Sequence, residues 1–460
     1  MKSKLLFWRF LHDENRLNGK TVIMDRKIGL SLILGGLLLA AVGCGGNSGS
    51  SRSQTSSVSV DSQIKETIEA YFTNRFDSQK TLSYSKLDGN IMADNDDTQL
   101  DETFHKISLA QKKLVNNSIS NYQYQINYQK SSVNGDEANV ELSLNLYFHY
   151  QKAPSDLDSA ICGVNYSFVL KNNESNWVIT QIDSDLEEFE TFKNQVQEVM
   201  EQDTTLSKAA AIQQVDKTVT NEIELMRNNS IYLKGEATSS EISPDCGTES
   251  TDSSNISKSI YISCRKYTYN PSCAVAYAAK YYNAETTRDS LFYILDYDCT
   301  NFVSQCVWAG YVGFDADSID TFKNYVAKKN GMLYNEWYAG TGGGANSWEN
   351  AAALFEYMVN SKAAGPNATT DFSDYNAKHH YRTISAASIN VGDVIQLWYR
   401  TRYSHSIIIT RKTNNTSNCG YGDIYYSGHT NSRWNWSFWE AIYSSNYMRR
   451  LTPATTCYLK

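Results

Sequence analysis

The spacing of apolar residues after residue 62 predicts helices first. Ile64, Ile68, Tyr71 and Phe72 recur at the spacing of one helix face, which predicts an amphipathic entry helix. A second stretch of the same period, Thr103 to Val115, predicts a second helix.

Alternating apolar residues then predict four strands. Their apolar faces are Tyr122, Tyr124, Ile126 and Tyr128; Val140, Leu142, Leu144 and Leu146; Val164, Tyr166, Phe168 and Leu170; and Trp177, Ile179 and Ile182. Asn134-Gly135-Asp136 is a turn sequence between the first two. Helices followed by a curved antiparallel sheet resemble the cystatin-like or nuclear-transport-factor-like cone fold. We therefore expect an α+β cone-like module at residues 63–185, with no catalytic cluster of its own.

The rest of the chain is predicted to form a linker and a second domain. Helical spacing returns over Leu186 to Asn229, and Ser239 to Ser257 is rich in Ser, Thr and Asp, as interdomain loops are. We expect a helical and loop linker at 186–258 and a second α+β domain at 259–460.

The N-terminal sequence is typical of an exported protein. The uncharged run Ile28 to Val42 follows a charged stretch and is shorter than the roughly 18 residues of a membrane-spanning helix. Cys44 follows this run, and the residues up to Cys44 resemble a lipoprotein cleavage box. We expect residues 1–44 to be a signal peptide with lipidation at Cys44, a true start that could be Met24, and a flexible tether at 45–62. A membrane anchor that is not cleaved is the alternative, and both hypotheses place the protein outside the cytoplasm, anchored to the bacterial membrane.

Composition and charge narrow the possible functions. The 460 residues carry 42 basic and 50 acidic side chains, a net charge of −8, and no basic block. Nucleic-acid binding is not expected, because it requires clustered Lys and Arg. His379-His380 has no HExxH motif or spaced carboxylates beside it, so neither a metal nor a cofactor is expected. We expect a monomer.

One cysteine lies where a nucleophile would be activated. Apolar residues after Cys299 share a helix face, which predicts a helix beginning at Cys299 with Asp298 as its N-cap. A helix N-terminus stabilises a thiolate and offers N–H groups to an oxyanion. Asp298 opposes the thiolate, so a histidine partner is required.

Two later histidines are candidates for that partner and for its orienting group. The sequence predicts successive strands over 391–398, 404–410 and 423–427, with His405 at the start of the second and His429 just after the third. A cysteine on a helix, a histidine on a later strand and a polar residue on the next strand form a papain-type arrangement.

Several motifs across residues 267–451 occur together in one protein family. They are Tyr269-Asn270-Pro271, Ala274–Ala278, the DCTNFVSQ octet at Asp298–Gln305, Ser347-Trp348, Gly392–Gln396, His405-Ser406 and His429-Thr430-Asn431. In this order they resemble the bacterial putative amidase domain family, similar to NlpC-type and CHAP cysteine hydrolases with papain-like folds. The resemblance implies Cys299 as nucleophile, His405 as general base and His429 as the orienting residue, with Asn431 in reserve. One departure is Asp296-Tyr297, where the family often has two glycines.

The sequence therefore predicts an exported cysteine amidohydrolase that cleaves an amide bond in cell-wall peptidoglycan peptides. Two alternatives remain open. One is a cysteine peptidase or acyl-transferring enzyme acting on a protein or small amide, and the other is a surface lipoprotein whose second domain is not catalytic.

The other cysteines and three tryptophans could have structural roles. Cys306 is expected to be buried, whereas disulfides are possible among Cys246, Cys264, Cys273, Cys419 and Cys457. Three tryptophans, Trp434, Trp436 and Trp439, either pack in a core or form a sugar platform.

Overall fold

The computed structural model describes residues 60–459 except 174–175, 236–264, 285, 288, 294, 296, 315–336, 361, 363–364, 373–379, 400 and 446. All of them belong to one compact unit, Ser56–Lys460. The predicted signal peptide with Met24 and Cys44, and the tether up to residue 59, lie outside the described residues. In the part that is described, no helix is both long enough and apolar enough to span a bilayer.

The first elements follow the predicted order of helices and then strands. They are α1 (Ser62–Thr81), α2 (Asp96–Leu114), β1 (Ile119–Asn134), β2 (Glu137–Tyr150), β3 (Asp158–Asn173) and β4 (Asn176–Ser184). The Asp61 carboxylate caps α1 by accepting hydrogen bonds from the N–H groups of Gln63 and Ile64, at 2.8 and 3.4 Å. The turn between β1 and β2 contains Gly135 at φ 64°, a conformation that glycine adopts without strain.

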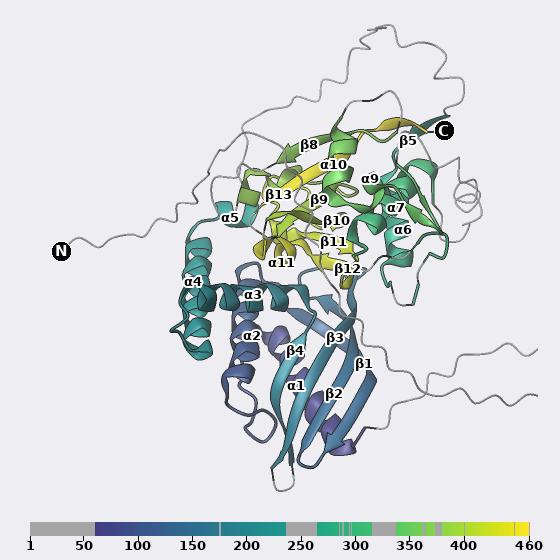
Figure 1. The fold of residues 1–460 in the computed structure, drawn as a ribbon. Coiled ribbons are helices and arrows are strands. Elements are labelled where there is room, and N and C mark those ends of the chain that lie inside the picture. The colour runs from purple at the N-terminus through teal and green to yellow at the C-terminus, as the bar shows by residue number, and fades with distance from the viewer. Residues whose placement is uncertain are drawn as a thin grey trace, which may run out of the picture. The chain divides into compact units, whose positions relative to one another are not determined.

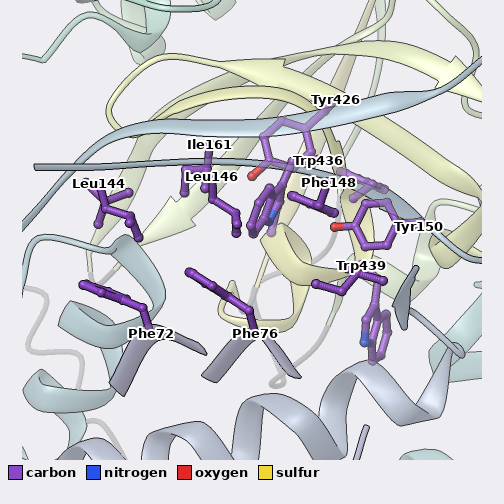
Figure 2. Close-up of a cluster of buried hydrophobic side chains, with 14 of the residues drawn as sticks. Phe72, Phe76, Leu144, Leu146, Phe148, Tyr150, Ile161, Tyr426, Trp436 and Trp439 are labelled. Carbon is purple, nitrogen blue, oxygen red and sulfur yellow. The ribbon is translucent and has the colours of Figure 1, made fainter. Parts of the chain in front are cut away.

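The apolar face of α1 packs on the sheet that β1–β4 form (Figure 1). Figure 2 shows Phe72 and Phe76 of α1 pointing toward Leu144 and Leu146 of β2. The same core includes Trp436 from the far end of the chain. The apolar spacing of the sequence is therefore explained by burial, but the core extends beyond the predicted module.

The predicted helical stretch after the sheet consists of α3 (Glu187–Gln202), α4 (Lys208–Asn228) and the short α5 (Ile231–Lys234). The apolar residues of α3 and α4 pack with α2 in a separate core, which includes Phe189, Phe192, Ile212 and Val215.

The C-terminal part combines helices and antiparallel strands. Its helices are α6 (Pro271–Tyr281), α7 (Cys299–Val312), α9 (Asn346–Glu349), α10 (Ala351–Val359), α11 (Phe438–Tyr443) and the 3-10 turns η2 (His380–Thr383), η3 (Ala386–Ser388) and η4 (Tyr421–Asp423). Its strands are β5 (Arg265–Thr268), β6 (Ala339–Gly340), β7 (Gly343–Gly344), β8 (Ala368–Phe372), β9 (Val394–Tyr399), β10 (Arg402–Lys412), β11 (Ile424–Gly428), β12 (Ser432–Ser437), β13 (Met448–Pro453) and β14 (Thr456–Leu459).

One ten-stranded sheet joins the two predicted domains. Its order is β1-β2-β3-β12-β11-β10-β9-β13-β8, and β4 also pairs with β3. The start of β3 pairs with β12, where Cys162 lies opposite Ser432 and Ala160 opposite Trp434. The rest of the same edge of β3 pairs with β4. The fold is thus α+β with a mostly antiparallel sheet, as predicted, and β3 is the strand that both halves share.

The structure also shows the state of the described cysteines and the burial of two of the three tryptophans. Cys306 is fully buried, and the cysteines that the structure describes, Cys162, Cys273, Cys299, Cys306, Cys419 and Cys457, are all free thiols. Cys246 and Cys264 lie outside the described residues. Trp436 and Trp439 are buried, which disfavours the sugar platform because their faces are not available to a ligand.

Candidate active site

The predicted nucleophile begins helix α7. Cys299 is the first residue of this helix and is 5% exposed, and the residues after it, from Thr300 to Tyr311, are buried. Asp298 occupies the predicted N-cap position, although its side chain makes no capping hydrogen bond. Its carboxylate instead accepts hydrogen bonds from Asn301 Nδ2, at 2.7 Å, and faces His429 Nδ1 at 2.6 Å.

The predicted base lies beside this thiol. His405 is buried on β10, and the thiol of Cys299 donates a hydrogen bond to the neighbouring carbonyl of Ser404 at 3.6 Å. Burial acts to raise the pKa of Cys299, but a hydrogen bond with His405, its positive charge, and bonds from Ser406 N–H and the Thr300 hydroxyl together lower it below its ordinary value. The arrangement favours a thiolate.

The pKa of the His405 imidazole is shifted in the opposite direction to that of the thiol. Burial acts to lower the pKa of His405, but the negative charge of Glu187 and the bond and charge of Cys299 outweigh it and raise the pKa above its ordinary value. A lowered thiol pKa and a raised imidazole pKa together favour a thiolate–imidazolium pair.

A buried hydrogen-bond network fixes the start of α7 against β10. The hydroxyls of Thr300 and Ser406 lie 2.9 Å apart, and Gln396 Nε2 donates to Ser406 Oγ at 3.2 Å. Gln396 Oε1 accepts from Arg449 Nε at 2.7 Å. Since Thr300 and Ser406 each follow a predicted catalytic residue, this contact sets the position of Cys299 relative to His405.

The other polar residues of the octet are also bonded inside the protein. Asn301 Oδ1 accepts from Trp348 Nε1 at 2.8 Å and from Gln305 Nε2 at 3.0 Å. Gln305 Oε1 accepts from the Tyr277 hydroxyl at 2.7 Å, and Ser304 Oγ donates to the Trp348 carbonyl at 2.8 Å. The octet is therefore a set of buried polar contacts around Cys299, and the sequence analysis assigned none of these contacts.

His429 does not bond the predicted base. Its Nδ1 faces the Asp298 carboxylate at 2.6 Å, its Nε2 faces the carbonyl of Tyr281 at 2.9 Å, and its ring stacks on Phe302 at 3.9 Å between centroids. Both ring nitrogens face oxygen acceptors, so neither is left to orient His405. The structure differs from the expected orienting role: His429 contacts Asp298, the residue before Cys299.

Asn431, the reserve candidate, is engaged elsewhere as well. Its Oδ1 accepts from the N–H of Glu187 at 3.1 Å, and its Nδ2 donates to the Asp185 carbonyl at 3.3 Å. It attaches the start of α3 to the hairpin after β11, so it too is not the orienting residue.

Acidic residues from α3 were missed by the sequence analysis. Arg433 on β12 donates to both carboxylate oxygens of Glu188, at 2.8 and 2.7 Å, and lies 3.9 Å from Glu187. No local motif marks these glutamates, because they precede the catalytic residues by more than a hundred positions.

Exposed tyrosines lie on the loops beside the nucleophile. Tyr297, two residues before Cys299, is 83% exposed, and Tyr293 is 50% exposed. The N–H of Tyr293 bonds the Gly340 carbonyl at 2.9 Å, which links this loop to the β6–β7 hairpin. A separate cavity of about 110 Å³ lies in the N-terminal half, around Arg75, Asp101 and His105, and none of the predicted catalytic residues lines it.

Among the described residues, no group of His, Cys, Asp or Glu is arranged to hold a metal ion. His379 is outside that part of the chain.

Comparison with known proteins identifies one domain. Neither a curated protein nor a solved structure matches the chain. Residues 268–452 match the family model described as a putative amidase domain, a stretch that contains Cys299, His405 and His429. This match supports an amidase-domain family for residues 268–452 and suggests amide-bond hydrolysis as their activity.

Proposed function

We propose that this protein is a cysteine amidohydrolase in which Cys299 is the nucleophile and His405 is the general base and acid. The observation that carries the proposal is that Cys299, at the start of α7, bonds the carbonyl of Ser404, the residue before the buried His405 on β10, at 3.6 Å. The lowered pKa of Cys299 and the raised pKa of His405 agree with a pairing of the two side chains. The amidase-domain match agrees with it, because attack on an amide carbonyl is what an activated thiolate performs.

The reaction proceeds in two stages. The Cys299 thiolate attacks the amide carbonyl carbon, and the oxyanion that forms is stabilised at the N-terminus of α7. His405 gives its proton to the leaving nitrogen as the C–N bond breaks, which leaves a thioester on Cys299. Water, deprotonated by His405, then attacks the thioester, and the acid is released as the thiolate re-forms.

We propose peptidoglycan stem peptides as the substrate. This proposal rests on the resemblance to cell-wall cysteine hydrolases and on the export signal in the sequence, in which Cys44 would carry the lipid anchor on the outer face of the membrane. The exposed side chains of Tyr293 and Tyr297 beside the nucleophile would offer aromatic surface to such a substrate.

The test is to incubate purified sacculi with the wild-type protein and with Cys299→Ala, and to identify released fragments by mass spectrometry. We expect new amide-cleavage products from the wild type alone. Equal release by both proteins would contradict the assignment of Cys299 as the nucleophile. Cleavage of peptides or small amides without release from sacculi would reject the cell-wall substrate and favour the peptidase alternative. A mature N-terminus that does not begin at a lipidated Cys44 would reject the lipid anchor.

A further inference from the structure

A buried histidine contacts the carboxylate of the residue before the nucleophile. The side chains of His429 and Asp298 are 6% and 16% exposed, and His429 Nδ1 lies 2.6 Å from Asp298 Oδ2. The other carboxylate oxygen accepts a hydrogen bond from Asn301 Nδ2 at 2.7 Å. Both oxygens of this carboxylate are therefore bonded inside the protein, although Asp298 occupies the N-cap position of α7.

Neighbouring contacts fix which atom of the Asn301 amide faces Asp298. Asn301 Oδ1 lies 2.8 Å from Trp348 Nε1, and an indole N–H can only donate. The same oxygen accepts from Gln305 Nε2 at 3.0 Å. Nδ2 is therefore the atom that faces Asp298, and it also donates to the Tyr293 carbonyl at 3.0 Å. The carboxylate thus has a fixed donor on the first turn of α7.

The surroundings of His429 favour its doubly protonated form. Its Nδ1 faces a carboxylate and its Nε2 faces the Tyr281 carbonyl at 2.9 Å, and only an imidazolium donates from both nitrogens. Tyr281 is the last residue of α6, and a positive charge is stabilised at a helix C-terminus. The ring also stacks on Phe302, whose aromatic face attracts a cation. A positively charged His429 satisfies all three contacts.

This pair changes the surroundings of Cys299 at the start of α7. An unpaired carboxylate on the preceding residue would oppose a thiolate by charge repulsion. It would also compete with the thiolate, because an N-cap side chain accepts hydrogen bonds from the first N–H groups of a helix. The Asp298 side chain makes no such bond, since His429 and Asn301 hold it. The helix N-terminus is left to the thiolate and to the oxyanion.

We propose that His429 is a positioning residue for the nucleophile: as an imidazolium, it neutralises the Asp298 carboxylate and holds it away from the N–H groups at the start of α7. Cys299 can then ionise although an acidic residue precedes it. This inference rests on the proposed function, and it gives His429 a role through Asp298 in place of the orienting role expected from the sequence.

The test measures the ionisation of Cys299, which needs no substrate. The rate of its alkylation by iodoacetamide is followed against pH, by peptide mass spectrometry, in the wild type, in His429→Gln and in Asp298→Asn with His429→Gln. We expect His429→Gln to move the midpoint to higher pH by about one unit, because the carboxylate loses its cation. The double variant also removes the carboxylate, so its midpoint should return to that of the wild type. His405 acts on the thiol in every variant, so only the state of Asp298 differs between them.

A second histidine supplies the matched control. His149 on β2 also faces an aspartate, Asp158 at 3.8 Å, but it lies in the N-terminal half, so His149→Gln should leave the Cys299 midpoint unchanged. An unchanged midpoint in His429→Gln would overturn the proposal. A shift that persists in the double variant would overturn it too, because the effect would then not act through Asp298.

Folding and catalysis give separate outcomes. If His429→Gln does not fold, the double variant carries the test, because it buries no unpaired carboxylate: a wild-type midpoint supports the proposal and a raised one rejects it. Loss of folding in both would make the role of His429 purely structural and reject it as well. Failure of the proposed function would look different, since the wild type would cleave no amide while the midpoint still shifts in His429→Gln.

Discussion

At the residue scale, the DCTNFVSQ octet explains why the site could be found from sequence. Its residue types are those that a buried nucleophile requires: a thiol, a hydroxyl that reaches β10, and two amides that satisfy one another. For that reason the sequence could single out Cys299 as a candidate nucleophile. His429 was placed correctly in the sequence order but assigned the wrong partner, because spacing cannot tell whether a ring faces His405 or Asp298.

The role found for His429 predicts a specific mutational outcome. His429→Ala removes two buried hydrogen bonds and the contact with Phe302, so we expect it to lower the free energy of unfolding by about 2–4 kcal/mol. We expect no displacement of the His405 titration midpoint. Chemical denaturation and NMR measure the two effects. Retained stability with a displaced midpoint would restore the orienting role.

At the element scale, the contact between α7 and β10 sets the position of Cys299 next to the strand that carries His405. The apolar residues predicted the helix and the strands, because α7 and β10 are buried along most of their length. The pairing of strands was not predictable, because apolar alternation does not specify which strand lies next to which. The attachment of α3 to β12 was missed for the same reason, since it depends on Asn431 and Arg433 meeting residues remote in sequence.

The hydroxyl contact between these elements can be tested directly. Ser406→Ala leaves Thr300 Oγ1 and Gln396 Nε2 each short of a partner, so we expect a stability loss of about 1–3 kcal/mol. We also expect kcat to fall, because the start of α7 is no longer fixed beside His405. Ser444→Ala, which removes a hydroxyl bond to the Ala441 carbonyl in the last turn of α11, is the control. Wild-type stability and kcat in Ser406→Ala would show that this contact does not set the geometry.

At the scale of the whole molecule, β3 and α3 join the N-terminal half to the half that contains Cys299 and His405. Beyond the shared sheet, partly buried hydrogen bonds cross between the halves: the Tyr150 hydroxyl donates to Glu440 at 3.0 Å, and Trp439 Nε1 donates to the Gln111 carbonyl at 3.0 Å. The sequence predicted two α+β parts and their order. It could not predict that one sheet joins them, because the sequence of an edge strand does not specify the strand with which it pairs.

This union predicts that the catalytic half does not fold alone. A fragment of residues 265–460 would expose the β12 edge and leave the buried Arg433 without Glu188, and an unpaired buried charge is strongly destabilising. We expect it to aggregate or to lack a cooperative thermal transition, and co-expression with residues 56–235 to restore one. Circular dichroism and size-exclusion chromatography provide the readout. A soluble fragment with the transition and activity of the full chain would contradict this picture.

The central claim is that His405 maintains Cys299 as a thiolate. Its most direct test is the rate of alkylation of Cys299 by iodoacetamide as a function of pH, followed by peptide mass spectrometry in the wild type and in His405→Ala. Because the pKa of Cys299 lies below its ordinary value, the wild type should react at pH values where an ordinary thiol, of pKa about 8.5, is protonated. The midpoint should rise in His405→Ala. Identical profiles with the midpoint of an ordinary thiol in both proteins would contradict the account.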